Sequence, residues 1–247
     1  MSGSAARVAV ITGGGRGFGK AFGHAFAGEG MLVVQVDIDL AAAEAAAAEI
    51  GPNARAMQGD VADEPAMHAL MRTIAEEHGG IDLLINNAGI HSAEANLPIG
   101  VLGTARTRQM FDVNVWGVIH CTLAARPFMQ GRKGASIINI SSMAAYGSQM
   151  AYGVTKLAVR GLTASFAHEL GGEGIRVNAI APGLILTETI KAELPEDVRS
   201  RVKAMQIVKR DGAEEDVVGA ALWLASPAAS FVTGETIRVS GGATLQV

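Results

Sequence analysis

Short runs rich in valine and isoleucine alternate with longer alanine-rich stretches along almost the whole chain. This alternation is typical of β-strand, α-helix, β-strand units that form a parallel sheet. Linkers, charge blocks and internal repeats are absent from the sequence. We therefore predict one α/β domain over residues 1–247, with a doubly wound parallel sheet and helices on both faces. The seven expected strands are Val8–Ile11, Leu32–Val36, Ala54–Gln58, Leu83–Asn86, Ser136–Ile140, Arg176–Ile180 and Thr236–Val239.

Two of the intervening segments carry clear helix signals. Phe18, Phe22 and Phe26 recur every four residues, and Gly30 follows them. This spacing predicts a helix with one buried stripe and a glycine at its carboxyl end. The alanine-rich segment Ala41–Glu49 is a second expected helix, because alanine has the highest helix propensity.

The composition argues against several classes of protein. The net charge is −4, so no basic excess is available for nucleic-acid phosphates or an acidic membrane. The first apolar run, Val8–Ile11, is too short for a signal peptide or a membrane span. The single cysteine cannot form an internal disulfide, and the six histidines lack ligand spacing. We expect a cytoplasmic protein with no metal site, nucleic-acid partner or membrane contact.

A glycine-rich turn lies between the first expected strand and the phenylalanine-striped helix. It runs from Thr12 to Gly19 and includes Gly13, Gly17 and Gly19. Glycines let the backbone turn tightly and approach a pyrophosphate, whose charge then faces the free N–H groups of the helix. Because every tight turn favours glycine, the cluster gains weight only from its strand-turn-helix context.

An acidic residue follows the second expected strand about 20 residues beyond the turn. A carboxylate at Asp37 can accept hydrogen bonds from both hydroxyls of an adenosine ribose and repel a 2′-phosphate. Alternatively, Asp37 and Asp39 only cap the next helix. Arg16 argues for NADP instead, since a cation there could pair with a 2′-phosphate. We weigh the repulsion at Asp37 above the solvated arginine and expect NAD as the cofactor.

One of the two tyrosines is followed four residues later by a lysine. Tyr152 and Lys156 therefore share a face of the expected helix. A phenol is a poor base at neutral pH, and an adjacent ammonium favours the phenolate. The pair is a candidate acid/base. The other tyrosine, Tyr146, lacks such a partner, so we expect it in packing or in a pocket wall.

Two serines end the fifth expected strand. Ligands of parallel sheets collect at the carboxyl ends of strands, so Ser142 could hold a carbonyl oxygen beside Tyr152. Both serines could instead cap the following helix.

In this order, the motifs resemble those of the short-chain dehydrogenases/reductases, single-domain Rossmann-type enzymes of about 250 residues. The resemblance spans nearly the whole chain. It rests on Thr12-Gly13, Gly17-Phe18-Gly19, Gly59-Asp60-Val61, Asn86-Asn87-Ala88-Gly89, Asn114, Ser141-Ser142, Tyr152 with Lys156, and Pro182-Gly183 through Thr187.

The resemblance implies an oxidoreductase that moves a hydride between a nicotinamide and a secondary alcohol or ketone. It assigns Tyr152 as general acid/base, Ser142 as the residue that orients the oxygen, and Lys156 as the residue that lowers the Tyr152 pKa and binds the nicotinamide ribose. Asn114 would position Lys156 and a water chain, although without the resemblance it is an ordinary polar helix residue.

The resemblance also implies contacts along the whole cofactor. Asp60 and Val61 would hold the adenine, and Asn87, Ala88 and Gly89 would support the cofactor side of the sheet. Pro182 and Gly183 begin the loop in which Ile185 and Thr187 would contact the carboxamide.

The chain departs from the family pattern in two places. Tyr152 follows Ser142 by ten positions, whereas in many members this interval is two or three residues longer, so Ser141 and Ser148 stay alternatives to Ser142. The stretch Asn87–Asn114, which contains His91, is slightly longer than usual and is expected to shape the substrate side. A helical apolar pattern after Thr187 indicates packing or a lid; it consists of Ile190, Leu194, Val198, Val202 and Met205.

Several alternatives stay open. We expect a homotetramer, from the resemblance and from apolar residues in the C-terminal third, namely Trp223, Leu224, Phe231 and Val232. A different enzyme of the same class would reduce 3-oxoacyl thioesters with NADPH. A protein of another class would be a catalytically silent nucleotide-binding scaffold. The small-molecule alcohol or ketone substrate is not fixed by the fold.

Overall fold

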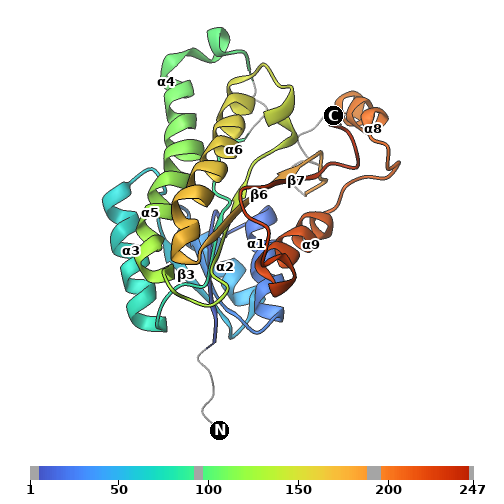
Figure 1. Ribbon diagram of the computed structural model, residues 1–247. Helices are drawn as coiled ribbons and strands as arrows, with labels where there is room; N and C mark the ends of the chain where they lie inside the picture. Colours follow the sequence, from blue (N-terminus) through green and yellow to red (C-terminus); the bar gives the residue numbers. More distant parts are fainter. Residues whose placement is uncertain (1–5, 92–96, 188–195, 245–247) are drawn as a thin grey trace.

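Seven parallel strands form one sheet in the computed structural model, which describes residues 6–91, 97–187 and 196–244 (Figure 1). The strands are β1 Val8–Thr12, β2 Leu32–Asp37, β3 Ala54–Gln58, β4 Leu83–Asn86, β5 Ser136–Ile140, β6 Arg176–Pro182 and β7 Thr236–Val239. All seven predicted strands are confirmed. β1, β2 and β6 continue one or two residues past their apolar runs, because ladder pairs such as Thr12 with Val36 and Pro182 with Val239 extend them.

The strand order places a functional crevice at the centre of the sheet. The order is β3-β2-β1-β4-β5-β6-β7, so the chain leaves β1 toward one edge and returns through β4 toward the other. In open α/β sheets, ligands bind outside the carboxyl ends of the strands where the order reverses. The glycine-rich turn after β1 and the segment after β4 meet at this point.

Helices cover both faces of the sheet (Figure 1). The larger helices are α1 Gly17–Gly28, α2 Leu40–Ile50, α3 Glu64–His78, α4 Ile99–Phe111, α5 Gly117–Met129, α6 Ala151–Leu170, α8 Glu196–Met205 and α9 Glu214–Ala225. Short helical turns lie at η1 Asp112–Trp116, η2 Met143–Tyr146, η3 Gly171–Glu173 and η4 Pro227–Ala229.

Alternate side chains of the central strands enter two separate cores. Val8 and Val10 of β1 pack with residues of α3, α5 and α6, whereas Ala9 and Ile11 pack with residues of α1 and α9. This follows from the two-residue period of a strand. Because both faces of the central strands are buried, strands such as β1 and β4 are mostly apolar rather than alternating, whereas the edge strands β3 and β7 carry the exposed residues Arg55 and Arg238.

The two predicted helices are confirmed. Phe22 and Phe26 of α1 are buried, and Gly30 follows the helix with a φ of +79°. The predicted helix Ala41–Glu49 extends to Leu40–Ile50, and the Asp39 side chain caps it by accepting a hydrogen bond from the Ala42 N–H.

Two of the four apolar C-terminal residues differ from the expectation of a shared subunit surface. Leu224 is fully buried in the core with α1, and Val232 packs partly against the same core. The other two reach the surface: Trp223 on α9 is 40% exposed, and Phe231 is fully exposed. Among the described residues, no helix is long and apolar enough to cross a membrane.

Candidate active site

A cleft of about 1220 Å³ runs along the carboxyl ends of the strands. Its walls extend from the glycine turn and Asp37, past Tyr152, to Met205 of α8. All residues that the sequence predicted for the site lie on this cleft except Gly19 and Asn114, which lie behind it. Within residues 6–91, 97–187 and 196–244, no group of three or more His, Cys, Asp or Glu side chains could hold a metal ion.

The glycines of the turn are required by close backbone contacts. Gly13 has a φ of +64°, and a Cβ there would lie 2.9 Å from the Ala88 Cα. A Cβ on Gly19 would lie 2.0 Å from the Gly13 carbonyl oxygen. Gly19 therefore acts by letting α1 pack directly against the turn, although it does not line the cleft.

The amino end of α1 fits a pyrophosphate. Arg16 precedes the helix without a side-chain cap, so the first N–H groups of α1 remain available to a ligand. Gly17 has a φ of +49°, and the space where its Cβ would lie is open. Backbone donors, the positive end of a helix dipole and open space are the features that bind a dinucleotide's phosphates.

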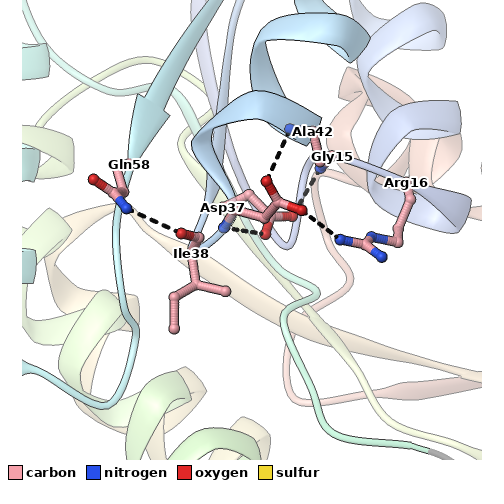
Figure 2. A network of polar contacts seen from close by, with 7 residues as sticks. Gly15, Arg16, Asp37, Ile38, Ala42 and Gln58 are labelled. Carbon is pink, nitrogen blue, oxygen red and sulfur yellow. Dashed lines mark hydrogen bonds and ion pairs between the residues drawn. The ribbon is translucent and has the colours of Figure 1, made fainter.

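Asp37 is held at the end of β2 by the glycine turn (Figure 2). One carboxylate oxygen accepts a hydrogen bond from the Gly15 N–H at 2.9 Å, and the other accepts from the Asp39 N–H at 3.1 Å. The side chain is almost buried, yet it lines the cleft. The capping role belongs to Asp39, whose Oδ1 accepts from the Ala42 N–H at 3.2 Å.

Arg16 has an acidic partner. Its Nη2 lies 3.0 Å from Asp39 Oδ2, and the two side chains are 70% and 47% exposed (Figure 2). Exposed ion pairs contribute at most about 1 kcal/mol, so the guanidinium can move. In this arrangement, however, its charge is already paired with a carboxylate.

Thr12 and Asn87 join the ends of β1 and β4. The Thr12 hydroxyl accepts hydrogen bonds from the N–H groups of Asn87 and Ala88, both at 3.1 Å. The Asn87 amide donates to the carbonyls of Thr12 and Gly13, both at 3.0 Å. These bonds fix the cleft floor where the strand order reverses.

The remaining predicted cofactor contacts also line the cleft. The Asp60 carboxylate accepts from the Ala62 N–H at 2.9 Å, and Val61 is buried beside it. Gly183 follows β6, and a Cβ there would lie 2.7 Å from the Ser240 Cα. Ile185 is buried at the start of the next loop, and Phe18, Gly89, Pro182 and Thr187 complete this wall.

Tyr152 lies in the first turn of α6 with its phenol in the cleft. Burial raises the pKa of Tyr152 to about 12, and a hydrogen bond with Ser142 opposes this rise only in part. This differs from the sequence expectation that Lys156 would lower the Tyr152 pKa. The ammonium lies 5.8 Å from the centre of the Tyr152 ring, and burial of the phenol dominates.

Lys156 lies one helical turn farther along α6. Its Nζ donates a hydrogen bond to the Ile140 carbonyl at 2.8 Å, and the side chain is 5% exposed. Burial lowers the pKa of Lys156 to about 8. The ammonium is therefore held at the carboxyl end of β5 and exchanges its proton near neutral pH.

The three candidate serines have different partners. The Ser141 hydroxyl is buried and donates to the Lys156 carbonyl at 2.9 Å. Ser142 accepts from the Ala144 N–H at 3.1 Å and hydrogen-bonds Tyr152. Ser148 lines the cleft and accepts from the Met150 N–H at 3.2 Å. Ser142 is thus the serine that the structure brings to the Tyr152 phenol.

Asn114 lies in a π-helical turn, η1, between α4 and α5. Its Oδ1 accepts from the Ile90 N–H at 2.7 Å, and its Nδ2 donates to the Ile90 carbonyl and the Thr155 hydroxyl, both at 3.1 Å. These bonds reach Lys156 only through the neighbouring Thr155. Turns of this kind are frequent at functional sites.

Some cleft residues, such as Gln109 and Met143, were not named in the sequence analysis. His91 was expected only as part of the stretch Asn87–Asn114 that shapes the substrate side, and it lies on the cleft just after the end of β4. Val198, Val202 and Met205 of α8 line the far end, while Ile190 and Leu194 lie outside the described residues.

Tyr146 forms part of the cleft wall, which is one of the two positions expected for it, packing or a pocket wall. The Arg160 guanidinium lies over its ring at 3.9 Å, and the Arg238 guanidinium lies 5.2 Å from the ring centre.

The sequence and the fold are similar to those of known proteins. A family model described as Enoyl-(Acyl carrier protein) reductase matches residues 13–244. The cis-4-hydroxycyclohexanecarboxylate dehydrogenase of Sinomonas cyclohexanicum is 39% identical over 245 residues, which cover 97% of this chain and 97% of that protein. The 7alpha-hydroxysteroid dehydrogenase of Escherichia coli (strain K12) is 35% identical over 243 residues, covering 96% and 93%. The crystal structure of a Short-chain dehydrogenase/reductase SDR:Glucose/ribitol dehydrogenase from Brucella melitensis gives a TM-score of 0.86, at 30% identity and 97% coverage of both chains.

Proposed function

The chain belongs to the short-chain dehydrogenase/reductase family and is an oxidoreductase of CH–OH groups that uses NAD(P), and we propose that it moves a hydride between NAD(H) and a secondary alcohol or its ketone. The observation that carries the proposal is the meeting of Ser142, Tyr152 and Lys156 with the glycine turn in one cleft. A proton-transferring group and a phosphate-binding turn in one cleft suit a reaction that moves a hydride and a proton together.

Tyr152 is the proposed general acid and base. During reduction, its phenol donates a proton to the substrate oxygen, and a pKa of about 12 keeps that proton in place until the oxygen gains negative charge. During oxidation, the phenol oxygen accepts the hydroxyl proton. Ser142 holds the same oxygen, because its hydroxyl already reaches the phenol.

Lys156 is the proposed partner of both the proton and the cofactor. With a pKa of about 8, it can take up a proton near neutral pH. Its bond to Ile140 keeps it at the end of β5, where it would contact the nicotinamide ribose. When bound, the nicotinamide accepts or supplies the hydride, and its oxidised form adds a positive charge that favours the Tyr152 phenolate.

Asp37 supports NAD(H) over NADP(H). Its carboxylate is fixed by two backbone N–H groups beside the turn, so it cannot easily move away from a 2′-phosphate. The opposing cation, Arg16, is paired with Asp39.

A reductase of acyl thioesters with NADPH is the second candidate, because the matching family model carries an acyl carrier protein reductase description. A panel of steroid, cyclic, sugar and acyl thioester substrates, each assayed with NAD(H) and NADP(H), separates the candidates. We expect NADH formation from a secondary alcohol. Turnover confined to NADPH and 3-oxoacyl thioesters would favour the second candidate, and binding of NADH without any turnover would identify a silent scaffold.

A further inference from the structure

His91 lies against the proposed catalytic tyrosine. The centre of its ring is 4.5 Å from the centre of the Tyr152 ring, with 52° between the two planes. The imidazole is exposed to the same cleft that Tyr152 lines. Because both side chains line one cleft, a single ligand can reach both of them, which makes His91 a candidate for substrate recognition.

A buried amide links the backbone segments that carry the two rings. Asn114 bonds to both the N–H and the carbonyl of Ile90, the residue just before His91. The same amide donates to the Thr155 hydroxyl, which in turn donates to the Tyr152 carbonyl at 2.7 Å. The positions of His91 and Tyr152 are therefore set relative to one another.

The lining of the cleft as a whole is mostly apolar, although polar side chains such as Gln109, Asp112 and Ser148 also contribute. Met143, Leu184, Val202 and Met205 contribute to its walls. An imidazole offers one donor and one acceptor when neutral, so it supplies a polar contact close to the reacting oxygen. A substrate that fits both the apolar lining and the His91 imidazole has an apolar body and a second oxygen near its reacting carbon.

We propose that His91 is a specificity-determining residue that hydrogen-bonds a second hydroxyl on the carbon next to the reacting one. The substrate class is then a vicinal diol, or the matching α-hydroxy ketone. This inference rests on the proposed function. Sites that hydrogen-bond a substrate hydroxyl reject analogues that lack it far more strongly than apolar pockets reject a changed methylene.

The test compares cyclohexanol with cis-1,2-cyclohexanediol, which share the same apolar ring. We expect the parent to have at least about tenfold higher kcat/KM for the diol. His91→Phe should keep the ring contact and lose about tenfold or more on the diol, while changing less than about threefold on cyclohexanol. His91→Gln, which again offers a donor and an acceptor, should restore part of the preference. His24→Phe, an exposed histidine on α1 outside the cleft, is the control.

The outcomes separate the inference from the proposed function. Equal kcat/KM for the two alcohols in the parent, or an equal loss on both in His91→Phe, would overturn the role of His91 and leave a dehydrogenase. If the parent oxidises neither alcohol, the inference is contradicted. The wider substrate panel then decides the proposed function. Melting temperatures equal to the parent's show that the variants are folded.

Discussion

Among single residues, Asp37 has the clearest consequence for the choice of cofactor. At an effective dielectric near 20, like charges about 4 Å apart cost on the order of 4 kcal/mol before screening. Even about 1.4 kcal/mol of that is tenfold in affinity. We therefore predict at least about tenfold higher kcat/KM with NAD than with NADP, and a narrowed or reversed preference in Asp37→Ser. The measurement uses one substrate with both cofactors. Equal efficiencies in the parent would show that Asp37 does not face the ribose.

Lys156 links function to stability through its buried charge. Below pH 8, the ammonium is charged in both the folded and the unfolded chain, and the full cost of burying it opposes folding. Between pH 8 and 10.5, the folded protein loses this proton first, so the cost shrinks as pH rises. Lys156→Met should therefore raise the free energy of unfolding at pH 7 by roughly 1–3 kcal/mol, since the lost bond to Ile140 offsets part of the gain.

The Lys156 prediction is checked by chemical denaturation without cofactor at pH 7 and above pH 10.5. The gain in the free energy of unfolding of Lys156→Met should be present at pH 7 and absent at the higher pH. The activity of this variant and its affinity for NAD should both be lower than the parent's. Lys133→Met, on an exposed turn, is the control and should leave stability unchanged. A variant less stable than the parent at pH 7 would mean that the lysine is not held in a desolvated site.

The sequence could identify the candidate acid/base residues but not their local surroundings. The four-residue spacing correctly placed Tyr152 and Lys156 on one face of a helix. It could not show that Lys156 bonds to the Ile140 carbonyl. Nor could it show that burial outweighs the Lys156 charge in setting the pKa of Tyr152, because both depend on packing between α6 and β5. For the same reason, only the structure separates the partners of Ser141 from those of Ser142.

At the scale of elements, Gly23 and Gln35 join α1 to β2 below the glycine turn. Gln35 is fully buried, and its Nε2 donates to the Gly19 carbonyl at 3.3 Å. A Cβ on Gly23 would lie 1.8 Å from that Nε2. Although Gly→Ala within a helix usually stabilises by about 0.5–1 kcal/mol, Gly23→Ala should destabilise by roughly 1–3 kcal/mol because of overpacking.

The contact is tested by a double-mutant cycle. Gln35→Val should remove part of the penalty of Gly23→Ala, since it removes the clashing amide but leaves the Ile50 Cδ1, which a Cβ on Gly23 would meet at 2.6 Å. Gly28→Ala, at the open end of the same helix, should change stability by less than about 0.5 kcal/mol. If Gly23→Ala lowers the free energy of unfolding equally in the parent and in Gln35→Val, the Gln35 amide is not the obstacle. The measurement is denaturant unfolding of all variants.

Element types followed from the sequence better than their irregularities did. All seven strands were located, most readily the central ones, because parallel strands that are buried on both faces need apolar residues on both. The π-helical turn at Asp112–Trp116 has no such signal, since its residues also suit an ordinary helix. Yet that turn carries Asn114, and so determines how the segment after β4 meets α6.

At the scale of the whole molecule, the exposed apolar residues favour assembly. Phe231 is fully exposed and Trp223 is 40% exposed. Large aromatic side chains of this kind are enriched at protein–protein interfaces. We predict a homotetramer, four times 25.4 kDa, and a shift to smaller species in Phe231→Asp. Sedimentation velocity at micromolar concentration measures both. A parent that sediments only at 25.4 kDa would contradict the prediction.

The doubly wound architecture was predictable, but the strand order was not. Strands that are apolar on both faces can pair with any neighbour, so sequence pattern alone cannot place β4 beside β1. The structure supplies that pairing, and with it the cleft in which the glycine turn, Asp37 and Tyr152 come together.

The most direct test of the account is steady-state turnover by Tyr152→Phe. The substitution removes the transferable proton and leaves the ring, the glycine turn and Asp37 in place. With an alcohol that the parent oxidises and NAD, we predict a fall in kcat of about 10²–10⁴-fold, with the dissociation constant for NADH nearly unchanged. Turnover within about tenfold of the parent's would contradict the assignment of Tyr152 as the acid and base of this cleft.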